Sequence, residues 1–130
     1  MRALLLLALA GVAVAGCGTD RAEDAARVAE GFYAAVAEED GRRACRQLTP
    51  GTASQLEKDE GKPCEEAVLA LSLSGERAAD SAVYVTAAKV DLDAGDSVFL
   101  DEAPGGWKIA AAGCRPQPGE EAPYDCELDS

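Results

Sequence analysis

Five cysteines and the absence of histidine limit the chemistry open to this chain of 130 residues. Without an imidazole, neither a Ser-His-Asp nor a Cys-His catalytic arrangement can form. Four of the cysteines, Cys45, Cys64, Cys114 and Cys126, lie in the part of the chain that we expect to fold. No Cys-x-x-Cys spacing occurs, which disfavours a zinc site. The sequence therefore predicts neither a metal nor another cofactor, and it favours structural disulfides.

The fifth cysteine, Cys17, follows a short basic start and an unbroken apolar run at 3–15. This run is too short to span a bilayer comfortably and is typical of a signal peptide. The Val-Ala-Gly-Cys sequence at 14–17 resembles the lipobox of bacterial lipoproteins, in which the cysteine receives a diacylglycerol thioether before the peptidase cuts. An ordinary secretory signal with an incidental cysteine is the alternative. The resemblance predicts a signal peptide at 1–16 and a mature chain that begins at lipidated Cys17.

Export would place the folded part in an oxidising compartment, where disulfides persist. Four thiols allow three pairings. We expect Cys45–Cys64 and Cys114–Cys126, because these pairs are nearest in sequence. Each closes a short loop and would stabilise the fold by roughly 3 kcal/mol in the loop-entropy model. The predicted location is the extracytoplasmic face of the cell membrane.

Charge restricts the partners of the domain. All 24 acidic residues follow Cys17, whereas Arg2 is the one charged residue in 1–16, so a mature chain would keep 11 basic residues and a formal charge of −13. Such a domain repels phosphate backbones and anionic headgroups. Nucleic acid is therefore not an expected partner, and the lipid must attach the protein to the membrane. Solubility alone would also explain the charge.

One acidic pattern requires a choice between two interpretations. Asp91, Asp93, Gly95, Asp96 and Glu102 are spaced in part like the ligands of an EF-hand calcium loop. The glycine that this loop requires at its sixth position is Asp96, and the flanking sequences indicate strands. A hairpin turn with solvated acidic ends explains the same residues, so no calcium site is predicted.

The elements that would position these residues begin with a long helix. Apolar residues at spacings of three and four predict about 20 helical residues after the start of the mature chain. Asp20 is the expected N-terminal cap, and Gly41 is the expected terminator. Residues 17–19 would form a lipidated N-terminus with a short tether. Shorter helices are expected at 42–48, from 52 to about 60 with Gly61 at its end, and from 63 to about 71.

The second half of the chain has the composition of strands. Residues 81–92 are rich in Val, Tyr and Thr and could divide near Ala87 into two strands. Further strands are expected at 98–100 and 107–112. The tail from 116 to 130 is acidic, contains proline and has no core pattern, so we expect only the disulfide at Cys126 to hold it.

Helices followed by an antiparallel meander indicate an α+β fold. The long first helix, the short helices with cysteines and the final Gly-Trp-Lys-Ile-Ala-Ala-Ala-Gly-Cys segment resemble small lipoproteins of high-GC Gram-positive bacteria. These are similar to the cystatin-like group that includes nuclear transport factor 2 and the SnoaL-like cyclases. The resemblance covers about 20–115, the predicted domain. It implies a curved sheet wrapped on the first helix with a conical pocket between them, and it implies no specific function.

Four aromatic residues are candidates for lining that pocket, namely Tyr33, Tyr84, Phe99 and Trp107. The alternative is that they are ordinary core residues. No catalytic residue can be transferred from the family position by position. We therefore expect a non-enzymatic, membrane-anchored module that binds a small lipophilic ligand or a protein partner. A small enzyme that uses a pocket carboxylate and a tyrosine, or a structural envelope protein, are the alternatives.

Overall fold

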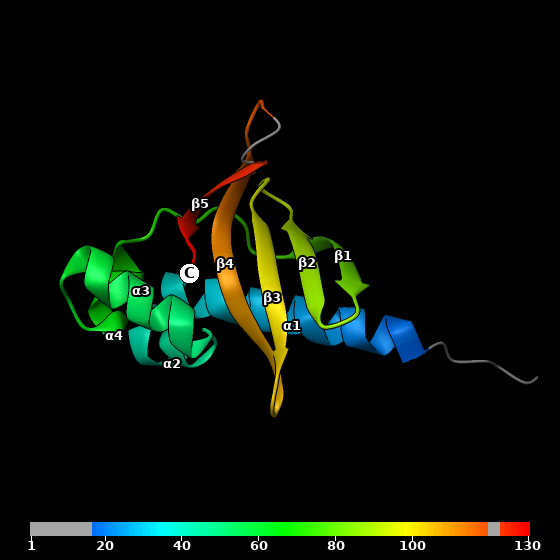
Figure 1. Ribbon diagram of the computed structural model, residues 1–130, viewed down its shortest axis with the longest axis horizontal. Coiled ribbons are helices and arrows are strands. Elements are labelled where there is room, and N and C mark those ends of the chain that lie inside the picture. The colour runs from blue at the N-terminus through cyan, green and yellow to red at the C-terminus, as the bar shows by residue number, and fades with distance from the viewer. Residues whose placement is uncertain (1–16, 120–122) are drawn as a thin grey trace, which may run out of the picture.

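A computed structural model describes residues 17–119 and 123–130, so the predicted signal peptide at 1–16 lies outside the described residues. The fold is α+β, as predicted, with the long first helix across one face of a five-stranded antiparallel sheet that does not close into a barrel, and with the short helices beside the sheet (Figure 1). Among the described residues, no helix is long and apolar enough to cross a bilayer. The elements are α1 (Cys17–Ala37), α2 (Gly41–Arg46), α3 (Pro50–Glu60), α4 (Cys64–Ala67), the 3-10 helix η1 (Val68–Ala70), β1 (Ala78–Tyr84), β2 (Ala87–Leu92), β3 (Ser97–Ala103), β4 (Gly106–Pro116) and β5 (Tyr124–Leu128).

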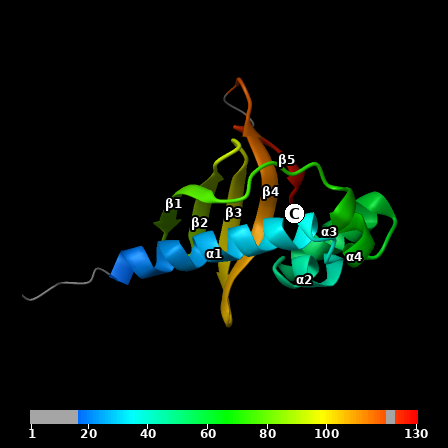
Figure 2. The same cartoon turned by 180° about the vertical axis from the view of Figure 1, so that it is seen from behind.

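Helix α1 crosses one face of the sheet (Figure 2). Ala25, Ala29 and Phe32 recur at spacings of three and four and are fully buried. The helix begins at Cys17, so the residues expected to form a short tether are its first turn, and Asp20 lies inside it. Cys17, the residue predicted to be acylated, thus lies in the first turn of a helix.

Gly41 does not terminate α1, contrary to our expectation. Helix α1 ends at Ala37, and Gly41 is the first residue of α2, whose N-terminus is capped by the Asp40 side chain. A Cβ atom at Gly41 would lie 1.9 Å from the carbonyl oxygen of Glu65. Glycine is required here because α2 and α4 approach each other closely, not because a helix ends.

Helix α3 begins and ends at residues that are typical of helix termini. Thr49 caps α3 by accepting a hydrogen bond from the Thr52 amide, and Pro50 occupies its first turn. Gly61 ends α3 in a left-handed conformation with φ of 65°, as predicted. The predicted third short helix is divided into α4 and η1. These elements gather at the C-terminal end of α1 (Figure 1).

The sheet is a simple meander in the order β1-β2-β3-β4-β5. The turn between β1 and β2 lies at 85–86, slightly before the division that we expected near Ala87. Val90, Val98, Leu100 and Ile109 are fully buried on the face toward α1. With Phe32 of α1, these side chains fill the space between the helix and the sheet.

The tail contributes a strand that sequence patterns did not indicate. β5 pairs antiparallel with β4, and Leu128 is only 3% exposed within the core. The sequence here does alternate as in a half-buried strand, with Tyr124, Cys126 and Leu128 on one side and Asp125 and Glu127 on the other. The surrounding acidic residues and prolines made this pattern hard to recognise. The tail is therefore part of the sheet.

Both disulfides are present with the pairings that we expected. Cys45–Cys64 joins α2 to α4, and Cys114–Cys126 joins β4 to β5. Oxidised pairs are typical of proteins outside the cytoplasm. The first disulfide holds the short helices together, and the second holds the last strand on the sheet.

Candidate functional site

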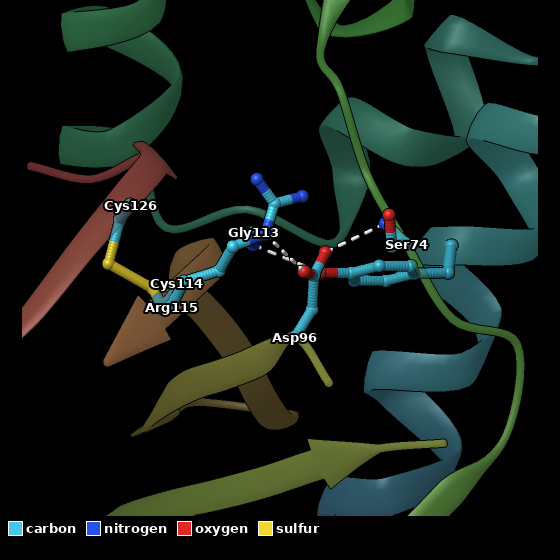
Figure 3. A network of polar contacts seen from close by, with 7 residues as sticks. Ser74, Asp96, Gly113, Cys114, Arg115 and Cys126 are labelled. Atoms are coloured by element: carbon cyan, nitrogen blue, oxygen red, sulfur yellow. Dashed lines mark hydrogen bonds and ion pairs between the residues drawn. A yellow bond between two sulfur atoms is a disulfide. The ribbon is translucent and has the colours of Figure 1, made fainter. Parts of the chain in front are cut away.

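Asp96 is a buried carboxylate between the turn after β2 and the first residue of β3. It is 1% exposed. Its Oδ2 atom accepts hydrogen bonds from the Ser74 amide at 2.7 Å and from the Tyr33 hydroxyl at 3.3 Å. Its Oδ1 atom accepts from Arg115 Nε at 3.3 Å (Figure 3). Burial of a carboxylate is tolerated when donors such as these replace water.

Tyr33 extends this network from α1 to β4. Its hydroxyl oxygen accepts a hydrogen bond from the Gly113 amide at 3.0 Å while its proton points to Asp96. Burial raises the pKa of Tyr33 far above its ordinary value of 10.0, and the negative charge of Asp96 adds to this effect although the Gly113 amide opposes it. The phenol therefore stays protonated at neutral pH and does not serve as a base.

The network of Asp96 and Tyr33 joins four parts of the chain. These are α1, the segment before β1, the turn before β3, and β4. Among the described residues, every buried side-chain nitrogen and oxygen has a hydrogen-bond partner. The polar groups of this centre are thus occupied by one another, and the arrangement fixes the relative positions of the four parts.

The acidic pattern that resembles a calcium loop does not converge on one point. Within the described part of the chain, no group of three Asp, Glu or Cys side chains is placed to hold a metal ion. The other three carboxylates of this pattern each have a separate partner. Asp91 accepts a hydrogen bond from Ser97 at 2.6 Å, and Asp93 accepts one from the Glu76 amide at 3.0 Å. Glu102 forms an ion pair with Arg21 at 2.9 Å. The hairpin interpretation accounts for these residues.

The four aromatic candidates are dispersed and do not line a common pocket. Tyr33 and Trp107 are buried in the core, at 4% and 7% exposure. Phe99 lies on the other face of β3 and contacts the ring of Tyr124 with 5.0 Å between centroids. Tyr84 is 62% exposed at the end of β1, so it cannot line a space between helix and sheet. That space is filled, and the cavities lie at its margins.

An open groove of about 580 Å³ runs between α1 and the segment that precedes β1. Tyr33 contributes one edge, and the small residues Gly31, Ala34 and Ala37 of α1 leave room for it. Five of its ten lining residues are charged, namely Arg27, Glu30, Glu38, Glu76 and Arg77. A second groove, of about 510 Å³, lies between α1 and the turn from β3 to β4, and Trp107 lines it.

The wall of the first groove is held by three carboxylates from two parts of the chain, because Asp93 and Asp96 lie in the turn between β2 and β3 and Glu30 lies in α1. They accept hydrogen bonds from alternate backbone amides: Asp96 from Ser74, Asp93 from Glu76 at 3.0 Å, and Glu30 of α1 from Ala78 at 3.1 Å. The hydrogen bond from Glu76 is also the main reason that the pKa of Asp93 is lowered. An irregular segment is thereby held in one conformation, so the groove is preformed.

The sequence pattern indicated Tyr33 but neither its partner Asp96 nor the groove. Asp96 appeared only as the wrong residue at a glycine position of the calcium pattern, which was the one sign of a special role. No protein family, curated protein or solved structure matches this chain. The resemblance to the cystatin-like group therefore stays a prediction.

Proposed function

We propose that this protein is a membrane-anchored, extracytoplasmic and non-enzymatic module that binds a protein partner in the groove between α1 and the 74–78 segment. The observation that carries the proposal is the groove wall, where three carboxylates accept hydrogen bonds from backbone amides of the 74–78 segment. A surface that is rigid before binding loses little conformational entropy when a partner docks. Such a preformed surface favours recognition.

The chemistry of the groove favours a protein over a small lipophilic ligand. Sites for small lipophilic molecules enclose most of the ligand in apolar surroundings. Here half of the lining is charged and the groove is open, with Arg27 and Arg77 beside three glutamates. Both signs of charge and a floor of small side chains suit a polypeptide that carries acidic and basic residues.

The anchor is supported by the lipobox resemblance at 14–17 and by two disulfides, which are typical of oxidising compartments. If Cys17 carries the lipid, α1 joins the domain to the bilayer without an intervening linker. A partner should then be a membrane protein or a protein that works beside the membrane.

Two glycines on helices allow a matched test of the groove. Gly31 of α1 lines the groove, Gly51 of α3 lies elsewhere, and neither has an atom closer than 4.0 Å to a Cβ added there. We expect crosslinking in native envelopes to recover the same partner with the wild type and with Gly51→Lys, and to lose it with Gly31→Lys. Replacing helical glycine does not weaken the helix, so both variants should fold.

Equal recovery of the partner with both lysine variants would exclude the groove as its site. Co-purification of a lipid with the wild type, but not with Gly31→Lys, would instead favour a lipophilic ligand. The anchor is tested separately by the intact mass of protein purified from envelopes. We expect a chain that begins at Cys17 with added acyl mass, and a Cys17→Ser variant that is neither acylated nor cut there.

A further inference from the structure

The turn between β1 and β2 exposes the two most accessible large hydrophobic side chains of the described residues. Tyr84 is 62% exposed and Val85 is 83% exposed, whereas Leu69, the third, is 38% exposed. The two residues are consecutive, so they form one apolar projection. Neither residue belongs to the hydrophobic core, so burial within the domain does not account for them.

The backbone at Val85 strengthens this interpretation. Its φ is 55°, in the left-handed region that a β-branched residue rarely adopts. Two-residue hairpin turns favour Gly, Asn or Asp at such positions. The side chain of Val85 is almost fully exposed, so side-chain packing within the domain does not offset this strain. A valine at this position is explained if an apolar surface outside the protein receives it.

The position of the turn relative to Cys17 identifies that surface. Arg21 of α1 donates a hydrogen bond to the carbonyl oxygen of Val85 at 2.7 Å. Arg21 also pairs with Glu102 and lies 5.3 Å from the ring centroid of Trp107, so the turn is firmly attached to the helix. Arg21 lies four positions after Cys17, a rise of about 6 Å along a helix. The apolar turn is therefore held close to the residue that would carry the lipid.

We propose that the Tyr84–Val85 turn is a second contact with the membrane, which inserts beside the lipid of Cys17 and sets the orientation of the anchored domain. This inference rests on the anchor of the proposed function. Tyrosine is enriched at membrane interfaces, where its ring is buried and its hydroxyl stays hydrated. The acidic domain as a whole is repelled by anionic headgroups, so the contact is expected on zwitterionic lipid.

The arrangement of the molecule agrees with an upright orientation. β1 and β2 lie over the N-terminal half of α1, and the short helices lie at its other end (Figure 1). The Tyr84–Val85 turn is hydrogen-bonded to Arg21 in the first turns of α1, so it lies at the Cys17 end of the domain. The short helices would then lie on the side away from the bilayer.

The test uses lipidated full-length protein in phosphatidylcholine vesicles that contain a nitroxide-labelled headgroup lipid. A fluorescent dye is attached through Thr86→Cys, which leaves Tyr84 and Val85 intact, or through Leu69→Cys in η1 as the matched control. We expect stronger quenching of the dye at 86 than at 69. In a Tyr84→Ser/Val85→Asn background, quenching at 86 should fall to the value at 69, and the turn should remain folded because Asn tolerates a positive φ.

Each outcome decides the proposal. Equal quenching at 86 and 69, or quenching at 86 that survives the double substitution, overturns the membrane contact although the anchor stands. A signal at 86 that needs envelope proteins in addition to lipid assigns the turn to a protein interface and also overturns it. Intact mass without acyl groups overturns the anchor itself, and with it both proposals.

Discussion

At the scale of single residues, Asp96 shows how one carboxylate organises irregular structure. Its two oxygen atoms accept from Ser74, Tyr33 and Arg115, which lie 22, 63 and 19 residues away in the chain. Hydrogen bonds to a charged group are stronger than neutral ones, and the loss of a buried acceptor leaves its donors unsatisfied. Asp96 should therefore affect the stability of the whole fold.

We expect Asp96→Asn to lower the free energy of unfolding by about 1–3 kcal/mol, because the Ser74 amide and the Tyr33 hydroxyl lose a charged acceptor in the core. The asparagine side chain keeps one oxygen as an acceptor, but its NH2 group would face donors such as the Ser74 amide and Arg115. Urea denaturation gives the value. Asp101→Asn on the exposed surface of β3 is the control, and it should change stability by less than about 0.5 kcal/mol. Equal effects of the two substitutions would contradict the network.

Tyr33 should make the protein sensitive to alkali. Burial raises the pKa of Tyr33 in the folded state, so above pH 10 the unfolded chain loses the tyrosine proton while the folded chain keeps it. The free energy of unfolding should therefore fall as the pH rises above this value. Tyr33→Phe should reduce that slope, and at neutral pH it should cost about 1–3 kcal/mol because the Gly113 amide loses its acceptor.

Urea titrations of both proteins at neutral pH and above about pH 10 measure these two effects together. The comparison with Tyr33→Phe is needed because lysines also lose protons in this range, among them Lys89, whose pKa is raised mainly by its hydrogen bond to Asp91. An identical pH dependence in the two proteins would mean that Tyr33 does not titrate differently in the folded state.

At the scale of elements, the two disulfides act on separate parts of the fold. Cys45–Cys64 joins short helices that bury few residues of their own, and Cys114–Cys126 holds the terminal strand on β4. Short helices and edge strands are marginal when they stand alone. Covalent links are therefore useful at both places.

Replacing either cysteine pair by alanine should lower the free energy of unfolding by about 3 kcal/mol, since the separations of 19 and 12 residues differ little in loop entropy. Hydrogen exchange distinguishes the two variants. Loss of Cys114–Cys126 should accelerate exchange at 124–128, whereas loss of Cys45–Cys64 should leave that strand protected. Accelerated exchange of the same segments in both variants would argue against independent roles.

The contact between α2 and α4 provides the second prediction at this scale. Gly41→Ala would place a methyl group 1.9 Å from the backbone oxygen of Glu65, so the two helices must separate. We expect destabilisation of about 1–3 kcal/mol, the usual range for overpacking. Gly51→Ala in α3 has open space around it and should be neutral or stabilising. Thermal unfolding of both variants would show a lower Tm for Gly41→Ala alone.

At the scale of the whole molecule, acidic charge opposes the compact state. The chain has 24 acidic and 12 basic residues, and the described ion pairs are on the surface apart from the one at Asp96. Surface ion pairs contribute little, and net charge far from zero produces self-repulsion. The repulsion is long-ranged and should be screened by salt.

We expect the free energy of unfolding to rise between low ionic strength and about 0.15 M sodium chloride, where the screening length falls to about 8 Å. The urea midpoint at each salt concentration measures this effect. A midpoint that falls with added salt would mean that favourable surface pairs outweigh the repulsion among the excess carboxylates.

The sequence by itself determined the features that depend on neighbours along the chain. The spacing of Ala25, Ala29 and Phe32 predicted α1, Gly61 predicted the end of α3, and proximity in sequence predicted both disulfide pairs. Helix periodicity, caps and short loops arise from contacts a few residues apart, so their causes are visible in a short window of sequence. The anchor at Cys17 is a prediction of the same local kind.

Only the tertiary structure decided how distant segments use their polar and small residues. Asp96 can be buried because three other parts of the chain supply its hydrogen-bond donors. A glycine is required at position 41 because α4 approaches α2 closely there. Leu128 enters the core because β4 has a free edge beside it. Each of these outcomes depends on which surfaces meet after folding, and the free energy of burial is determined by those surfaces rather than by the neighbouring sequence.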